Sequence, residues 1–286
     1  MNLASIIDGH RADSVAIVSR NRPTTYGELA DQVGHLRGGL AALGIGRGDR
    51  VALLCNNGRF FVDAYLAVLG LGAVAVPLNP GCPTPEMERE VATVEAKAVF
   101  VDPTAAAAWD GVKRANVPHL VHVVATEPGV AEPSATFAEL IAADPVPAVD
   151  VDDDDLAVLM FTSGTAGKPR AAMLTHGNLL ANLNQHRPDG GQITADDVIY
   201  AVLPVFHIFG LNVSLAMGLA RGATVVLVQR FDPSTALDTV RERKVTVMPG
   251  APPMWLAFSH FDAAPSDSFA TVRLALTGAA KMPEDA

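Results

Sequence analysis

The sequence predicts an α/β fold of stacked layers with parallel strands, and two observations lead to this prediction. Short apolar runs typical of buried strands alternate along the chain with segments whose apolar residues recur every three or four positions. The chain has 286 residues, of which 49% are hydrophobic and 18% charged, so it can bury a large core. Alternating strands and helices are typical of parallel sheets covered by helices, and ligands of such sheets bind outside the carboxyl ends of the strands.

The first helix is predicted from its cap and its apolar face. Thr25 and Glu28 have the spacing of a capping box. The positions that follow share one helical face, namely Leu29, Val33, Leu36, Leu40 and Leu43. Glycines then end the helix at positions 44, 46 and 48. The next predicted elements are strands at 51–54, 73–76 and 99–101, a helix at 60–71 and a helix start at Pro85.

Residues 126–155 differ from the segments on either side. They are rich in proline, at positions 128, 133, 145 and 147, and they end in the acidic run 152–155. This composition predicts an exposed connector whose aspartates form a solvated turn and not a cation site. We therefore expect two α/β halves, 1–150 and 151–286.

The second half repeats the alternation of strands and helices. It has predicted strands at 156–161, 223–228, 246–248 and 272–276, and predicted helices at 234–243 and 252–261. Residues 198–220 carry no formal charge and are long enough to span a bilayer. They also contain Pro204, His207 and Asn212, so we expect a buried strand, a loop and a buried helix at 209–219, with no transmembrane segment.

The net charge and the cysteine content argue against a nucleic-acid-binding protein and against a protein built on disulfides. The formal net charge is −10 and no basic stripe occurs, which argues against nucleic-acid binding. Cys55 and Cys82 are the two cysteines, and they suggest neither a disulfide framework nor a metal site. The first ten residues lack the pattern of a signal peptide. A reducing, cytoplasmic location fits these features best.

The most informative stretch follows the predicted strand at 156–161. It reads Thr162, Ser163, Gly164, Thr165, Ala166, Gly167, Lys168, Pro169 and Arg170. Glycines let backbone N–H groups approach an anion, and hydroxyls add further donors. The two cations neutralise charge, so the predicted ligand is a phosphate chain. The spacing is neither that of a Walker A loop nor that of a nucleophile elbow. From composition alone, a surface loop rich in serine, threonine and glycine is an equal alternative.

This stretch resembles the phosphate loop of the adenylate-forming superfamily, which contains the acyl-CoA synthetases, peptide-synthetase adenylation domains and firefly luciferase. It departs from the family pattern at Ala166, Arg170 and Ala171. Three further segments resemble family motifs in the same order, at 69–79, 203–211 and 276–280. The resemblance implies the layered αβαβα large N-terminal domain of these enzymes, truncated before the C-terminal lid domain.

The resemblance also implies a reaction. A carboxylic acid, fatty or aryl, is activated by ATP to an acyl-adenylate and then transferred to CoA, with Mg²⁺ as the metal. The residues implied to cradle the phosphates are Thr162, Ser163, Gly164, Thr165, Ala166, Gly167 and Lys168, with Thr165 also at the Mg²⁺. Those implied beside the adenine and the acyl carbonyl are Gly278, Ala279 and Ala280. The implied catalytic residue is His207, bordering the carboxylate end of the acid.

Each of these roles has a structural alternative. His207 stands among apolar residues, as a histidine making one structural hydrogen bond would, and Gly278 could belong to an ordinary turn. We expect Trp109 and Trp255 to be core or interface aromatics. The remaining histidines have no spacing that indicates a metal site.

Several family motifs are missing from the sequence. These are a Tyr-Gly-x-Thr-Glu segment, the aspartate that binds ribose and the lysine of the small C-terminal domain. We therefore expect these residues alone to bind nucleotide weakly without turnover. Open alternatives are a fatty acyl-AMP ligase that loads a carrier protein, a luciferase-like oxygenase and a non-catalytic nucleotide-binding remnant. The identity of the acid and the oligomeric state stay open.

Overall fold

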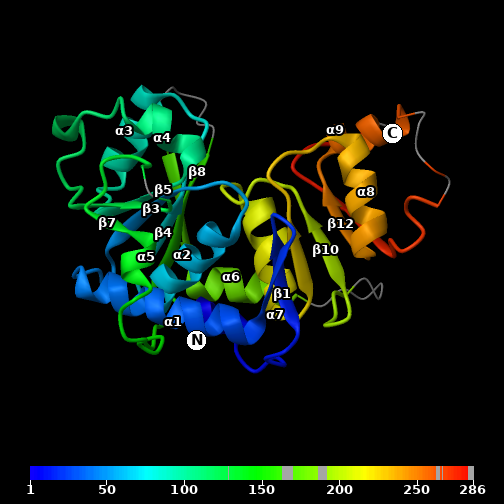
Figure 1. The fold of residues 1–286 in the computed structure, drawn as a ribbon, viewed down its shortest axis with the longest axis horizontal. Helices are drawn as coiled ribbons and strands as arrows, with labels where there is room; N and C mark the ends of the chain where they lie inside the picture. Colours follow the sequence, from blue (N-terminus) through cyan, green and yellow to red (C-terminus); the bar gives the residue numbers. More distant parts are fainter. Residues whose placement is uncertain (128, 163–169, 186–191, 262–264, 266, 283–286) are drawn as a thin grey trace. The chain divides into compact units, whose positions relative to one another are not determined.

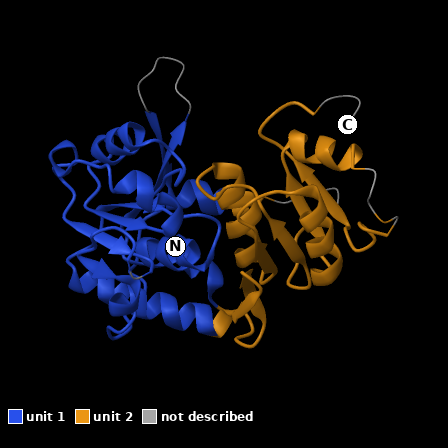
Figure 2. Ribbon diagram, turned by 45° about the horizontal axis from the view of Figure 1, so that its top comes forward, with its two compact units in different colours: residues 1–8, 28–182 blue, residues 9–27, 183–286 orange. Residues whose placement is uncertain are grey.

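The computed structural model describes residues 1–286 apart from 128, 163–169, 186–191, 262–264, 266 and 283–286 (Figure 1). The chain divides into two compact units (Figure 2): unit 1 comprises residues 1–8 and 28–182, and unit 2 comprises residues 9–27 and 183–286. These units do not coincide with the halves 1–150 and 151–286, which remain a prediction of domain organisation. Residues 9–27 lie in unit 2, and residues 151–182 lie in unit 1.

Unit 1 contains a sheet with strand order β7-β6-β5-β3-β4-β8-β9. Its strands are β3 (Arg50–Leu54), β4 (Val74–Pro77), β5 (Ala98–Val101), β6 (His122–Ala125), β7 (Ala135–Thr136), β8 (Leu156–Thr162) and β9 (Arg170–Thr175). Neighbouring strands are parallel except β8 and β9, which are antiparallel. The predicted strands at 51–54, 73–76, 99–101 and 156–161 are confirmed, whereas β6, β7 and β9 were not predicted.

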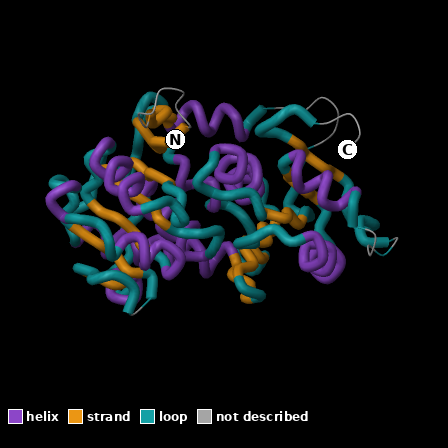
Figure 3. The backbone as a smooth tube through the Cα atoms, turned by 90° about the horizontal axis from the view of Figure 1, so that it is seen from above, coloured by secondary structure: helices purple, strands orange, loops and turns teal. Residues whose placement is uncertain are grey.

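Along the chain, helices lie between the parallel strands of unit 1; Figure 3 draws helices in purple and strands in orange. They are the 3₁₀ helix η1 (Leu3–Ile7), α1 (Tyr26–Ala42, whose first residues belong to unit 2), α2 (Arg59–Gly70), α3 (Thr84–Thr93), α4 (Pro103–Trp109), the 3₁₀ helix η2 (Arg114–Asn116), α5 (Phe137–Leu140) and α6 (His176–Leu183). The apolar face of α1 is buried as predicted, with Leu29, Val33, Leu36 and Leu40 each 0% exposed. Pro85 lies in the first turn of α3, where its missing N–H costs nothing.

One apolar cluster covers a face of this sheet. It joins Ala52 and Leu54 of β3 to Met87 of α3 and Trp109 of α4. Trp109 is therefore a core residue, as expected. Because side chains alternate along a strand, Val51 and Leu53 point to the opposite face, and both are buried as well. A sheet buried on both faces explains why its strands read as continuous apolar runs.

The predicted connector at 126–155 is only partly correct. The acidic turn is present, since Asp152, Asp153 and Asp154 are exposed and the Asp155 N–H donates to the Asp152 carbonyl at 3.1 Å. The middle, however, forms β7 and α5, and Thr136 caps α5 through a capping box. The proline-rich composition obscured this helix, whose buried Phe137 is too isolated to show a period.

Unit 2 contains a second sheet, with order β13-β12-β10-β11-β1-β2. Its strands are β1 (Val15–Ser19), β2 (Arg22–Thr25), β10 (Val198–Ala201), β11 (Thr224–Leu227), β12 (Val247–Gly250) and β13 (Leu274–Thr277). All neighbours are parallel except β1 and β2. This hairpin was not predicted, because its turn residues Arg20 and Asn21 have positive φ angles of 49° and 62° without a glycine to signal them.

The helices of unit 2 are η3 (Phe209–Ala216), α7 (Met217–Ala220), α8 (Pro233–Arg243) and α9 (Pro252–Ser259). Figure 1 shows α8 and α9 beside β12, and their side chains share one apolar cluster with Tyr200 and Met248. The helix predicted at 209–219 is confirmed, and the structure adds that its first part, η3, is a π-helix. Within the described residues, no helix is both long and apolar enough to cross a membrane.

A buried ionic cluster ties together the amino ends of three strands in unit 2. Asp197, which is 3% exposed, precedes β10 and accepts hydrogen bonds from Arg273 Nε at 2.8 Å and Thr246 Oγ1 at 2.6 Å. Arg273 and Thr246 directly precede β13 and β12. The opposite, carboxyl edge of the sheet is the edge where ligands of parallel sheets bind.

Candidate functional site

The predicted phosphate loop connects β8 and β9 of unit 1. The ladder between these strands ends at the pair Thr162 and Arg170, and Thr162 Oγ1 donates to the Arg170 carbonyl at 3.4 Å. Both residues are exposed at the carboxyl end of β8, which runs parallel to β4. This is the edge where ligands of parallel sheets bind. The other predicted phosphate ligands lie outside the described residues, namely Ser163, Gly164, Thr165, Ala166, Gly167 and Lys168; this includes Thr165 as the predicted Mg²⁺ ligand.

His207 lies in unit 2, directly before the π-helix η3. Its N–H donates to the Pro204 carbonyl at 3.0 Å, and its own carbonyl accepts from the Leu211 N–H at 2.9 Å. Its ring lies 4.7 Å from the ring of Phe206, centroid to centroid. The residue is exposed, yet partial burial of the ring lowers the pKa of His207 below its ordinary value. This shift favours the neutral imidazole, which can donate one hydrogen bond.

Glycine 210 allows the helix to begin so close to the strand end. A Cβ at this position would lie 2.1 Å from the Pro204 carbonyl oxygen and 2.6 Å from its carbon. The π-helical turn that follows is shown by the Met217 N–H, which donates to the carbonyl of Asn212, five residues back. Inserted π turns occur often at functional sites, because they redirect side chains within a helix.

The segment 278–280 follows β13 in the same unit. A Cβ on Gly278 would lie 3.1–3.2 Å from carbons of the Phe209 ring. The absence of a side chain at Gly278 therefore permits the aromatic contact. Ala279 has a φ of 70°, a left-handed conformation that costs an alanine about 1 kcal/mol. Ala280 is exposed. The structure thus brings together two of the predicted motifs, 203–211 and 276–280.

A second glycine–aromatic contact was not predicted. Gly250 ends β12 and pairs with Thr277 of β13, one residue before Gly278. A Cβ on Gly250 would lie 2.8–2.9 Å from Cε2, Cζ2 and Nε1 of Trp255. Trp255 is partly buried and packs on the apolar cluster of unit 2, which agrees with the expectation of a core or interface aromatic. A glycine at the end of a strand, with a tryptophan on the next helix, was the signal that sequence reasoning overlooked.

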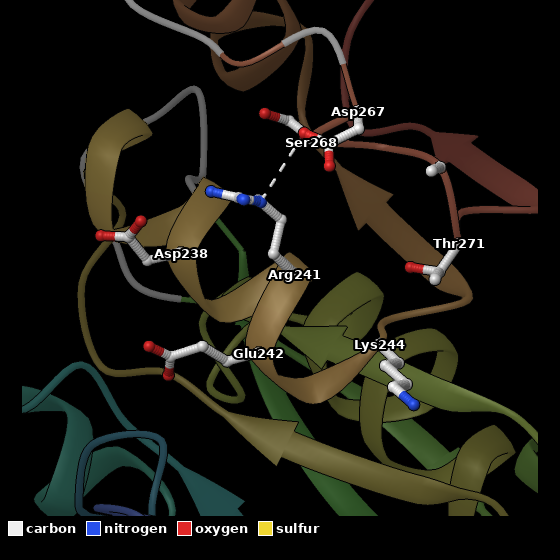
Figure 4. A pocket seen from close by; sticks show the side chains of 8 residues that line it. Asp238, Arg241, Glu242, Lys244, Asp267, Ser268 and Thr271 are labelled. Atoms are coloured by element: carbon white, nitrogen blue, oxygen red, sulfur yellow. Dashed lines mark ion pairs between the residues drawn. The ribbon is translucent and has the colours of Figure 1, made fainter.

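A different hollow of unit 2 lies beside α8 (Figure 4). It has a volume of about 510 Å³ and is bordered by Asp238, Arg241, Glu242, Lys244, Asp267, Ser268, Ala270 and Thr271. Arg241 and Asp267 form an ion pair of 3.8 Å across it. Lys244 and Thr271 precede β12 and β13, so the hollow faces the amino ends of these strands. Its mixed charges and its position separate it from the carboxyl edge that carries His207 and Gly278.

The described part of the chain shows neither a reactive cysteine nor a cluster of metal ligands. Cys55 and Cys82 are free and buried, and burial raises the pKa of the Cys82 thiol to about 12. Both thiols are therefore unreactive at neutral pH. Among the described residues, no group of three or more His, Cys, Asp or Glu side chains could hold a metal ion.

Comparisons with known proteins agree with this architecture. The family model described as "AMP-binding enzyme" matches residues 7–286. The chain is 32% identical over 285 residues to 4-coumarate–CoA ligase 3 of Oryza sativa subsp. japonica, covering 98% of this chain and 49% of the relative. It is 33% identical over 261 residues to a feruloyl-CoA synthase of Amycolatopsis sp., covering 91% of this chain and 50% of the relative.

A solved structure shows the same fold. The anthranilate CoA ligase AuaEII in complex with anthranoyl-AMP has a TM-score of 0.89 at 24% sequence identity, covering 99% of this chain and 56% of that one. The present chain spans about half the length of the curated relatives it matches. With its two parallel-rich α/β sheets, it corresponds to the N-terminal domain of the adenylate-forming enzymes. The chain belongs to the family of AMP-binding enzymes.

Proposed function

We propose that the protein takes part in the ATP-dependent activation of an aryl carboxylic acid to its acyl-adenylate, followed by transfer to CoA. The relatives named above are CoA ligases of 4-coumarate and ferulate, which are aromatic acids. They favour the aryl over the fatty branch of the two substrate classes expected from the sequence. The observation that carries the proposal is the contact of Phe209 with Gly278, beside His207.

The contacts of unit 2 suggest how the acid would be held. The Phe209 ring offers an aromatic face to a planar acid, and ring pairs of this kind contribute about 1 kcal/mol beyond the area they bury. Partial burial lowers the pKa of His207 and so favours the neutral ring, whose N–H would donate to a carboxylate oxygen and orient it for attack on the α-phosphorus. A neutral donor orients the carboxylate without neutralising its negative charge, so the acid remains a nucleophile.

The turn at 162–168 would hold the β- and γ-phosphates, with backbone N–H groups, hydroxyls and Lys168 as the donors. Such donors stabilise the charge that develops on the leaving pyrophosphate. Thr165 would hold Mg²⁺, which would supply positive charge to the phosphate oxygens. CoA is the proposed acceptor, and the cytoplasm is the proposed location.

Binding of stable adenylate analogues tests this function. Sulfamoyl-adenosine analogues of 4-coumarate and decanoate would be titrated into the protein by calorimetry. We expect the aryl analogue to bind at least tenfold more tightly, because the aromatic contact is absent for an alkyl chain. Equal or tighter binding of the decanoyl analogue would contradict the aryl assignment. Failure of both analogues to bind would contradict the activity itself.

A further inference from the structure

Within the part of the chain that the structure describes, the indole N–H of Trp255 is a buried donor without a hydrogen-bond partner. Its Nε1 atom is inaccessible to solvent. A buried N–H left unpaired costs about 1–3 kcal/mol, and buried tryptophans usually find a partner. A phenylalanine would fill a similar space without this cost. The N–H group therefore calls for an explanation beyond packing.

The position of the indole points to a ligand. The ring atoms nearest to Gly250 are Cε2, Cζ2 and Nε1, so the edge carrying the N–H lies against the carboxyl end of β12. On the adjacent strand, one residue past the partner of Gly250, Gly278 receives the ring of Phe209. Two aromatic side chains thus rest on glycines at neighbouring strand ends. This is the edge where parallel sheets bind ligands.

The residues around Trp255 determine which kind of hydrogen-bond acceptor the indole N–H can have. Trp255 and Phe209 both pack on the apolar cluster that contains Tyr200, Val202 and Met254. A carboxylate would be costly to bury among these residues, whereas a neutral oxygen that accepts one hydrogen bond would not. Hydroxyl and methoxyl groups on an aromatic ring are acceptors of this kind.

We infer that the Trp255 indole N–H donates a hydrogen bond to an oxygen on the ring of the aryl acid, so that Trp255 determines specificity for oxygen-substituted aryl acids. This inference rests on the proposed function. A site that hydrogen-bonds a substrate oxygen discriminates strongly against the analogue that lacks it, because the donor is then left unpaired.

The test compares two adenylate analogues that differ by one oxygen, 4-coumaroyl and cinnamoyl sulfamoyl-adenosine. We expect the wild-type protein to prefer the 4-coumaroyl analogue by about tenfold, since one hydrogen bond contributes about 1.4 kcal/mol. Trp255→Phe should bring this ratio close to one while the affinity for the cinnamoyl analogue changes less than about twofold. Trp109→Phe, in the core of unit 1, is the matched control and should keep the full ratio.

A second variant guards against misfolding of Trp255→Phe. Because the chain has 2 tryptophans, the Trp109→Phe protein can be produced with a benzothienyl analogue of tryptophan at position 255 alone, which replaces N–H by sulfur and keeps the shape. This replacement should also remove the preference. An unchanged preference, or an equal loss of affinity for both analogues, would overturn the inference and leave the proposed function standing. Binding of neither analogue to the wild-type protein would defeat both.

Discussion

His176 shows at the residue scale how a buried histidine can serve structure. Its side chain is 0% exposed, and its Nδ1 accepts a hydrogen bond from the Leu3 N–H at 3.0 Å. It thereby fixes the N-terminal helix η1 to the start of α6 within unit 1. Burial lowers the pKa of His176 to about 4, despite the nearby carboxylates of Asp155 and Asp153. The accepting nitrogen must stay unprotonated for the bond to persist.

This histidine should make the protein sensitive to mild acid. Unfolded histidine titrates near 6.5, so between pH 6.5 and 4 the unfolded chain binds a proton that the folded chain excludes. The contribution is complete above pH 6.5 and is lost as the pH falls to 4. We expect the free energy of unfolding in urea to lose about 2 kcal/mol more in wild type than in His176→Gln on going from pH 7 to pH 5.

Comparison with the variant is needed because other groups act in the opposite direction. Burial raises the pKa of Asp63 and of Glu90 to about 7, so both carboxyls favour the folded state as the pH falls. Their effect is the same in both proteins and cancels in the difference. The exposed His119→Gln is the control and should follow the wild type. Equal pH dependence in wild type and His176→Gln would refute the role of this histidine.

At the scale of elements, glycines let the helices of unit 2 approach the strands. Gly210 lies against the backbone of Pro204, whereas Gly218 in α7 lies against side chains of β10 and β11. An added Cβ at Gly218 would meet Ile199 Cδ1 at 2.6 Å and Val225 Cγ2 at 2.8 Å. The ends of flexible side chains can move aside for an added Cβ, whereas backbone atoms cannot. Substitution by alanine should therefore be tolerated better at Gly218 than at Gly210.

The pair Gly210→Ala and Gly218→Ala tests this difference. We expect Gly210→Ala to destabilise the protein by more than about 3 kcal/mol, as for severe overpacking, and Gly218→Ala by about 1 kcal/mol. Thermal unfolding followed by circular dichroism gives both values. A smaller loss for Gly210→Ala than for Gly218→Ala would show that η3 can shift away from the strand.

The ionic cluster at Asp197 should make the free energy of unfolding depend on pH in a more acidic range than His176 does. Burial by itself would raise the pKa of Asp197, but hydrogen bonds from Arg273, Thr246 and the Thr194 N–H lower it to about 2. An unfolded aspartate titrates near 3.9, so the stabilisation is complete above that pH and is lost as the pH falls to 2. We expect wild type to lose about 2 kcal/mol in this range relative to Asp197→Asn. The exposed Asp267→Asn is the control; if it behaved like Asp197→Asn, the cluster would have no special role.

At the scale of the whole molecule, the chain carries the candidate phosphate turn in unit 1 and the candidate acid-binding residues in unit 2. The proposed phosphate ligands all lie at the end of β8 or in the turn between β8 and β9. Their part in nucleotide binding can therefore be tested separately from the residues of unit 2.

We expect ATP with Mg²⁺ to raise the melting temperature of the wild-type chain and to leave the combined variant Thr165→Ala and Lys168→Ala unchanged, since the variant lacks a hydroxyl and a cation of the phosphate turn. Arg22→Ala, outside the turn, should respond to ATP as wild type does. An ATP response of the combined variant would contradict this expectation.

The sequence by itself determined the α/β class, most strands and the family. These depend on local periodicity and on motifs, such as the buried face of α1 and the stretch at 161–170, which need no knowledge of distant contacts. The family resemblance, and not local periodicity, singled out His207 and Gly278.

Only the tertiary structure decided which of these residues meet. The contact of Phe209 with Gly278 joins residues far apart in the chain. Phe209 follows β10 and Gly278 follows β13, and parallel pairing through β12 places these two strands in one sheet. Three further features were not predicted: the hairpin at Arg20 and Asn21, the π geometry of η3, and the N–H of Trp255, which has no partner among the described residues. Each depends on backbone angles or on burial, and these are properties of the packed chain that no local pattern of residue types records.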